Sequence, residues 1–230
     1  MLRKRILLKQ TIAGDLNTKL LLHLDNNVID SSPYNVTTSQ ASGTTFTAGR
    51  FNQGFIGKEI SSVLDLSPIS TPDGYLSSLL NTDFTIDFWL YGPGIDPYYG
   101  SSPFMLGANP DTSEYPLLFN ISSPYNGYNY VALMVYKDST SSELIVMPVP
   151  SAVFSDWVHI AVIKNATTIK IYVNGSAIAE TSPTDLSVYF STFSGTKSFI
   201  GISTATIDEF RVSNVVRWTS NFTPPTAPYA

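Results

Sequence analysis

The sequence predicts an all-β fold in which two antiparallel sheets pack face to face as a sandwich. Apolar and polar residues alternate in several short segments, of which 84–91 (FTIDFWLY) is the clearest, and a period of two is the mark of a half-buried strand. With 15 prolines and 14 glycines, the chain is interrupted too often for a long helix. A length of 230 residues without a linker-like stretch indicates one domain.

The expected strands follow one another along the whole chain. In 84–91 the apolar face is predicted to point into the core between the sheets. Segments 130–136 (YVALMVY) and 157–163 (WVHIAVI) are apolar on both faces, so they are expected to be central and covered on both sides by loops or a partner. Further strands are expected at 19–25, within 46–57, and at 198–203 and 206–212.

A hairpin is expected around Asn174 and Gly175, which join the stretches TIKIYV and AIAE. A two-residue type I′ turn requires positive φ at both central positions, and the pair Asn-Gly tolerates this best. The first strand has two faces, with Ile169, Ile171 and Val173 on one side and Thr168, Lys170 and Tyr172 on the other.

These motifs, in this order, resemble the laminin-G-like branch of the concanavalin A-type lectin and glucanase jelly rolls. The matching segments are KLLLHLDNNVIDSS, FTAGRFNQGFIG, FTIDFW, SDWVHIAVIK, TIKIYVNG and TIDEFRV. The resemblance extends from about Lys19 to Pro225 and implies a concanavalin A-like jelly roll over 18–230, including a short proline-rich tail. The ending RWTSNFTPPTAP is similar to that of phage virion proteins and of bacterial secreted or surface proteins.

Composition restricts the classes of partner. Only 13% of residues are charged and the formal net charge is −5, so a nucleic-acid partner is not expected, because phosphate binding needs clusters of lysine and arginine. The apolar run after Arg3, Lys4 and Arg5 is too short for a signal peptide or a membrane span. Residues 1–17 are therefore interpreted as a basic arm, either a disordered terminus or a segment that docks on virion proteins or other copies of the chain.

No catalytic constellation is predicted. The resembling glucanases carry a Glu-x-Asp-x-x-Glu run, which is absent here. Asp83 and Asp87 share a strand face but would lie roughly 13 Å apart, whereas glycosidic carboxylate pairs are about 5 to 9.5 Å apart. His23 and His159 lie in alternating strands and are interpreted as structural. The chain is therefore predicted not to be an enzyme.

The resemblance implies a structural calcium site. In the family, the first and last strands lie side by side, and an acid from each contributes to the site. The matching positions are Asp25 and Asp208, with Asn26 and Asp30 as further oxygen donors. Asp208 is expected on the same side of its strand as Phe210.

An alternative without metal is also compatible with these residues. Asp25, Asn26 and Asp30 would then form Asx-turns, while Asp208 would pair with Arg211 or accept hydrogen bonds from loop amides.

Carbohydrate recognition is the family's usual soluble role, and aromatic rings beside amide groups are its usual platform. Such residues gather in two expected loops, at Tyr98, Tyr99, Tyr125, Asn126, Tyr128 and Tyr130. The alternative is that these tyrosines cover a sheet edge or fill a protein interface, where tyrosine is enriched.

Two functional placements remain at this point. The first is a non-enzymatic virion protein of a phage capsid or tail, which displays a lectin-like jelly roll for adhesion to host glycans. The second is a carbohydrate-binding module of a bacterial secreted or surface protein. A start at Met without a signal peptide or catalytic domain favours the first.

Overall fold

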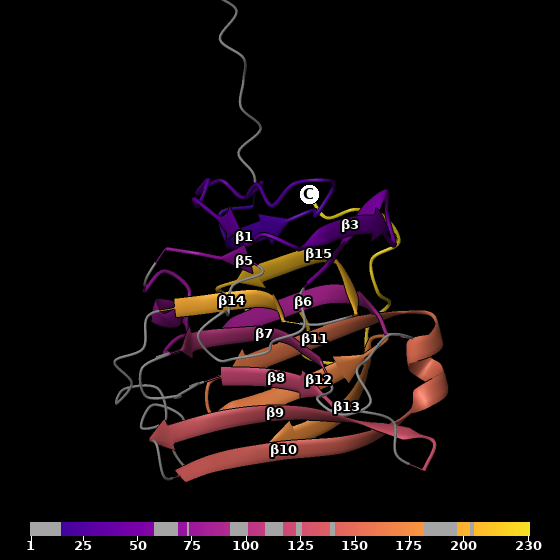
Figure 1. Ribbon diagram of the computed structural model, residues 1–230. Coiled ribbons are helices and arrows are strands. Elements are labelled where there is room, and N and C mark those ends of the chain that lie inside the picture. The colour runs from indigo at the N-terminus through magenta and orange to yellow at the C-terminus, as the bar shows by residue number, and fades with distance from the viewer. Residues whose placement is uncertain are drawn as a thin grey trace, which may run out of the picture.

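The computed structural model shows two antiparallel sheets stacked face to face (Figure 1), which confirms the predicted sandwich. It describes residues 15–57, 69–72, 74–92, 101–108, 117–122, 126–138, 141–181, 197–202 and 205–230. Within these ranges the helical segments are two short 3-10 turns, Ser77–Leu79 and Ser151–Ser155. No helix in the described part of the chain is long and apolar enough to cross a membrane.

The first sheet has the strand order β13-β12-β11-β6-β15-β4-β3, and β1 pairs with β15 outside this path. Both β1 and β4 pair with β15, so strands that are far apart in the sequence lie side by side in one sheet. The strands of this sheet are β1 Thr18–Leu22, β3 Thr45–Ala48, β4 Gln53–Ile56, β6 Phe84–Tyr91, β11 Trp157–Asn165, β12 Thr168–Val173, β13 Ser176–Thr181 and β15 Thr206–Ser213.

The second sheet has the order β10-β9-β8-β7-β14-β5-β2. Its two outermost long strands, β9 and β10, form an extended antiparallel pair. The strands of this sheet are β2 Ser39–Gln40, β5 Ile69–Ser70, β7 Ser101–Ala108, β8 Leu117–Ile121, β9 Tyr128–Asp138, β10 Ser141–Pro150 and β14 Lys197–Ile202.

The core lies between the two layers and is rich in phenylalanine. Phe88 and Phe210 from the first sheet stack with ring centroids 5.6 Å apart. Phe104 and Phe119 from the second sheet stack at 5.4 Å, and Phe88 meets Phe104 edge to face at 6.0 Å. All four side chains are buried. Since such pairs add to the energy of apolar burial, this cluster fixes how the sheets face each other.

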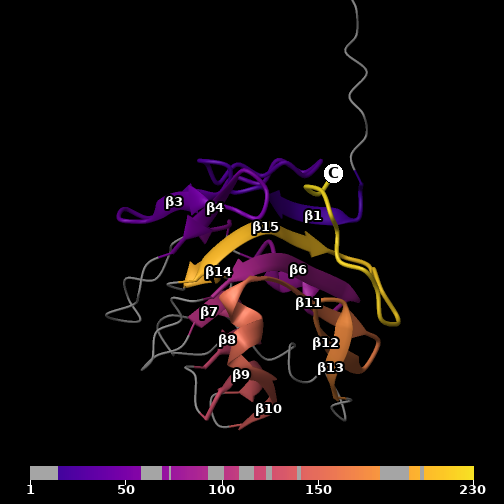
Figure 2. The same ribbon diagram turned by 90° about the vertical axis from the view of Figure 1, so that its right-hand side faces the viewer.

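The outer face of the first sheet is also buried, as the two-sided apolar pattern of 157–163 indicated. Residues 214–230 run along this face outside the layer of β6, β11 and β12 (Figure 2). The rings of Trp218 and Phe222 stack at 3.8 Å over the buried side chains of Ala161, Ile163 and Tyr172. The covering element is therefore the chain's own C-terminal segment.

The predicted hairpin turn is confirmed between β12 and β13. Asn174 and Gly175 have φ values of 49° and 75°, as a type I′ turn requires. The turn also holds the C-terminal segment, because the amide of Phe222 donates a hydrogen bond to the carbonyl of Gly175 (2.9 Å). A Cβ atom built on Gly175 would lie 1.9 Å from the carbonyl oxygen of Phe222.

Candidate functional site

An irregularity in β15 shapes the first candidate site. The register between β15 and β6 moves from Asp208 opposite Trp89 to Arg211 opposite Asp87, which inserts one residue into β15. Glu209 takes up the insertion with a φ of 52°, as in a β-bulge. Asp208 therefore shares a face with Trp89 and Arg211, and its expected placement on the side of Phe210 is wrong.

The bulge lies between the parts of β15 that pair with β1 and with β4, close to the turn between β3 and β4. Asp25 accepts hydrogen bonds from the amide of Gln53 (3.0 Å) and the side chain of Asn52 (3.2 Å). Asp208 Oδ2 accepts one from the amide of Phe51 (2.8 Å). Asp25 and Asp208 thus both bind the turn between β3 and β4, through backbone amides two residues apart.

Asp208 is buried, and its Oδ1 atom has no hydrogen-bond partner among the described residues. Burial raises the pKa of this carboxyl group to about 7, although the amide of Phe51 favours the charged form. An unpaired buried carboxylate oxygen is costly. A proton, a water molecule or a cation would each relieve that cost.

The neighbouring His23 binds Glu209, with Nδ1 2.9 Å from Oε1. This hydrogen bond, opposed by burial and helped by the charges of Glu209, Asp25 and Asp208, raises the pKa of His23. The histidine therefore has a carboxylate partner and balances part of the negative charge at the bulge.

The other two expected calcium donors lie in the loop after β1. Asp30 is buried and accepts hydrogen bonds from the amides of Leu21, Ser32 and Val36 and from the hydroxyl of Ser32. Its oxygens organise that loop. Asn26 is exposed. In the described part of the chain, no group of three or more acids or histidines is placed to hold a metal ion.

The second candidate site is an aromatic strip on the outer face of the second sheet. Tyr128 and Tyr130 point outward from β9, and their partners across β10 are Pro150 and Pro148. Tyr128 is 45% exposed and Tyr130 is half-buried. Residues opposite each other on one face of a sheet are in contact range. These four side chains lie on one face of the β9–β10 pair, and we call them the tyrosine strip.

A turn with left-handed backbone leads into the strip. Asn126 and Gly127 have φ values of 50° and 82°, and the carbonyl of Gly127 accepts a hydrogen bond from Ser151. Asn126 is exposed beside the start of β9. The other predicted sugar-binding residues, Tyr98, Tyr99 and Tyr125, lie outside the described residues.

Comparison with known families decides the classification. Residues 67–220 match the model of the concanavalin A-like lectin/glucanases superfamily, in its laminin-G-like form. The chain belongs to this superfamily. No curated protein sequence matches the chain.

Solved structures agree with the superfamily fold. Botulinum neurotoxin type C, which interacts with two ganglioside molecules, aligns with 87% of this chain at 18% identity and a TM-score of 0.65. The binding domain of botulinum neurotoxin DC in complex with rat synaptotagmin II aligns at 16% identity and a TM-score of 0.65. The chain spans about half of these toxin structures, 48% and 49% respectively.

A bacterial module of similar size also aligns. Domain 4 of AbnA, an extracellular arabinanase from Geobacillus stearothermophilus in complex with arabinotriose, matches at 15% identity and a TM-score of 0.55. The alignment covers 87% of this chain and 93% of that domain. At these identities, the comparisons establish a shared fold.

Asp87, one of the two acids whose expected spacing argued against a catalytic pair, is bound to an arginine. Asp87 is fully buried and forms two hydrogen bonds with the guanidinium of Arg211, at 3.0 and 2.8 Å. Burial opposes ionisation, but His159 and Arg211 hold the pKa of Asp87 below its usual value. Asp83 accepts a hydrogen bond from the amide of Ala166, so each acid has a structural partner.

His159 lies in the same network, under the C-terminal segment. Its Nε2 atom is 2.9 Å from the Tyr229 hydroxyl and 3.5 Å from Asp87. The amide of Tyr229 donates to Glu209 (2.9 Å), and its ring lies 3.9 Å from the Arg211 guanidinium. Sequence reasoning missed this network, because nothing in the order of the strands places the chain end on the face of β6.

Proposed function

We propose that this chain is a non-enzymatic carbohydrate-binding domain that holds glycans on the tyrosine strip. The observation that carries the proposal is the pair of outward tyrosines on one face of β9, flanked by prolines of β10. Structural neighbours that bind arabinotriose or interact with gangliosides support it.

The strip has the physical properties that sugar stacking needs. Residues two apart on a strand lie roughly 7 Å apart on one face, so Tyr128 and Tyr130 present two rings in a row. A tyrosine ring offers apolar contact to the C–H face of a sugar, and its hydroxyl offers a hydrogen bond. The strand pair β9–β10 holds these rings on a rigid scaffold, which lowers the entropy cost of binding.

Replacing Tyr128 and Tyr130 by alanine, singly and together, is expected to weaken glycan binding. Each stacked ring contributes about 1 kcal/mol, which corresponds to about a fivefold loss in affinity per ring. A glycan array identifies the ligand, and titration calorimetry then measures the dissociation constant of each variant.

Tyr34→Ala is the matched control, because Tyr34 is equally exposed but lies in the loop after β1. It should leave binding unchanged. Absence of any array signal from the intact protein, or equal losses in Tyr34→Ala and Tyr128→Ala, would contradict the proposal.

We also propose that calcium binds at the β15 bulge. The unpartnered Oδ1 of Asp208 and the carboxylate of Asp25, on one turn, supply the hard oxygen ligands that calcium prefers. When bound, the ion would supply positive charge that offsets the burial of Asp208. The oxygens of Asp30 are engaged in its loop, so the proposal rests on Asp25 and Asp208.

Millimolar Ca²⁺ is then expected to raise the melting temperature by mass action, and Asp208→Asn should abolish the rise. Differential scanning calorimetry with and without chelator measures it. Asp156→Asn, a change of an exposed acid just before β11 and two strands away from β15, should retain the full response. Identical melting curves with calcium and with chelator would refute the site.

For the biological context, we propose display on a phage virion, with residues 1–17 as the attachment arm; a bacterial secreted or surface module is the second candidate. The ending RWTSNFTPPTAP, which is similar to that of phage virion proteins, favours the virion. The alignment with an arabinanase domain favours the secreted or surface module. Residues 1–14 lie outside the described residues. Immunogold labelling of purified particles and of cells distinguishes the two placements.

A further inference from the structure

The chain contains two Asn-Gly pairs, and the structure places them in turns of similar backbone conformation but different surroundings. Asn126 and Gly127 have φ values of 50° and 82°, and Asn174 and Gly175 have values of 49° and 75°. In an Asn-Gly pair the asparagine side chain can react with the next backbone nitrogen, because glycine has no Cβ atom to hinder the approach. The surroundings of each turn therefore decide whether this reaction occurs.

The turn at Asn126 and Gly127 is open to solvent. Both residues are exposed, and apart from the adjacent residues no atom lies within 4 Å of a Cβ built on Gly127. Within the described part of the chain, no hydrogen bond engages the Asn126 side chain or the Gly127 amide nitrogen. The side-chain amide and the backbone nitrogen are thus both free to approach each other.

The turn at Asn174 and Gly175 is held closed by its neighbours. Oδ1 of Asn174 accepts a hydrogen bond from the amide of His159 (2.9 Å), which fixes the side chain. Gly175 is buried, and its carbonyl accepts a hydrogen bond from the amide of Phe222 (2.9 Å). A change of conformation in this turn would have to displace the C-terminal segment.

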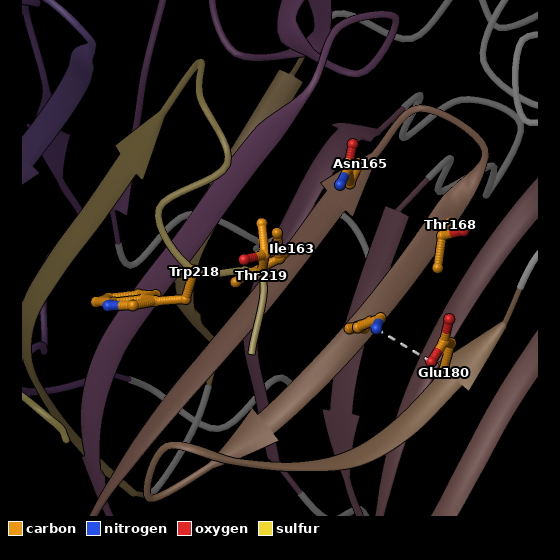
Figure 3. A pocket seen from close by; sticks show the side chains of 7 residues that line it. Ile163, Asn165, Thr168, Glu180, Trp218 and Thr219 are labelled. Carbon is orange, nitrogen blue, oxygen red and sulfur yellow. Dashed lines mark ion pairs between the residues drawn. The ribbon is translucent and has the colours of Figure 1, made fainter. Parts of the chain in front are cut away.

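A third turn shows that exposure alone does not make an asparagine reactive. Asn165, the last residue of β11, is exposed and lines a pocket on the outer face of the first sheet (Figure 3). The amide nitrogen of the next residue, Ala166, donates a hydrogen bond to Oδ1 of Asp83 (2.7 Å). That nitrogen has a single hydrogen to donate, and the Ala166 Cβ atom crowds it, so Asn165 is expected to be inert.

We propose that Asn126 is a site of spontaneous deamidation at the edge of the tyrosine strip. The Gly127 nitrogen loses its proton to hydroxide and attacks Cγ of Asn126, which closes a five-membered succinimide ring. The Cγ–Nδ2 bond breaks, and Nδ2 takes a proton from water and leaves as ammonia. Water then opens the ring at one of its two carbonyls and gives aspartate or isoaspartate, so the only reactant consumed is water.

Either product changes the surface next to the strip. A carboxylate replaces the neutral amide two residues before Tyr128, the first residue of β9. In isoaspartate the backbone also runs through the side-chain carbon, which adds one backbone atom immediately before the strand. Tyr128 would then shift relative to Pro150, its partner in β10. The reaction itself does not rest on the proposed function, because it is detected by its chemistry alone.

The test is an incubation of the purified full chain in mildly alkaline buffer, where the backbone nitrogen loses its proton more readily. Protein L-isoaspartate methyltransferase labels the isoaspartate, and peptide mapping by mass spectrometry locates both products. We expect Asn126 to react at least about tenfold faster than Asn174 or Asn165, since the latter two need local opening of the structure. In urea, where the turns are lost, Asn126 and Asn174 should react at rates within about threefold of each other.

A pair of alanine variants tests the role of the free glycine nitrogen. Gly127→Ala adds a Cβ atom beside that nitrogen and should slow the reaction at Asn126 at least fivefold. Gly74→Ala is the matched control, because Gly74 also has a positive φ of 77° and nothing within 4 Å of an added Cβ atom. It should leave the rate at Asn126 unchanged.

Three results would overturn the inference. The first is no product at Asn126 in the folded chain during the time in which the chain in urea is converted. The second is equal rates at Asn126 and Asn174 in the folded chain, and the third is an unchanged rate at Asn126 in Gly127→Ala. None of these results bears on glycan binding by the strip, which the array and the tyrosine variants test separately.

Discussion

Asp87→Ala should destabilise the domain by about 3–5 kcal/mol, because it leaves the charge of a buried arginine without its partner. Arg211 lies 93% buried beneath the C-terminal segment, and both of its hydrogen bonds to a carboxylate go to Asp87. The same change removes the acid next to His159. Urea unfolding followed by tryptophan fluorescence measures the loss of unfolding free energy.

A paired substitution separates the charge effect from a packing effect. Replacing a whole buried ion pair by apolar residues of similar volume is often neutral, so Asp87→Leu with Arg211→Met should recover much of the loss. If Asp87→Ala unfolds at the same urea concentration as the wild type, the ion pair contributes nothing to the free energy of unfolding.

The ion pair also predicts acid sensitivity. The pKa of Asp87 is lowered in the folded state, so its stabilising contribution is present above the unfolded value of about 4 and is lost as pH falls through the lower folded value. The unfolding free energy of the wild type should therefore fall more steeply below about pH 4 than that of Asp87→Ala.

Gly175→Val is expected to be the most damaging change outside the core. Residues held at positive φ cost about 1–3 kcal/mol when they carry a side chain, and a branched one is the least tolerant. In addition, the new Cβ would lie 1.9 Å from the carbonyl oxygen of Phe222. The C-terminal segment would have to move, and with it the stack of Phe222 on Trp218.

An alanine pair isolates the clash from the strain. Gly127 also follows an asparagine and has a φ of 82°, but nothing lies within 4 Å of a Cβ built there. Gly175→Ala should therefore lower the melting temperature more than Gly127→Ala, as differential scanning calorimetry can measure. Equal effects of the two variants would mean that the contact with Phe222 does not restrain the turn.

Alternation and turn chemistry were sufficient to predict the sandwich, the two faces of β6 and the Asn174-Gly175 turn, because these depend on neighbours in sequence. The bulges were not predictable in this way. A regular two-residue turn would pair Lys170 with Ala179, whereas the observed irregularity in the hairpin pairs it with Glu180. One inserted residue thus places Glu180 opposite Lys170, and the two side chains form an ion pair.

The candidate sites show the same division. The resemblance implied that the first and last strands lie side by side, and β1 does pair with β15. The face on which Asp208 lies depends on the positive φ of Glu209, and glutamate carries no local signal for that conformation. Packing around the bulge, including the contact of Phe51 with Trp89, determines it.

The pairing of β1 with β15 also constrains the order in which the domain folds. Leu22 meets Phe210, so this part of the sheet joins residues almost two hundred positions apart, and β6 gains its second neighbour only when β15 is available. Contacts between distant residues close slowly. During synthesis, one edge of β6 would remain unpaired until β15 has left the ribosome, and in that period the edge can pair with another chain.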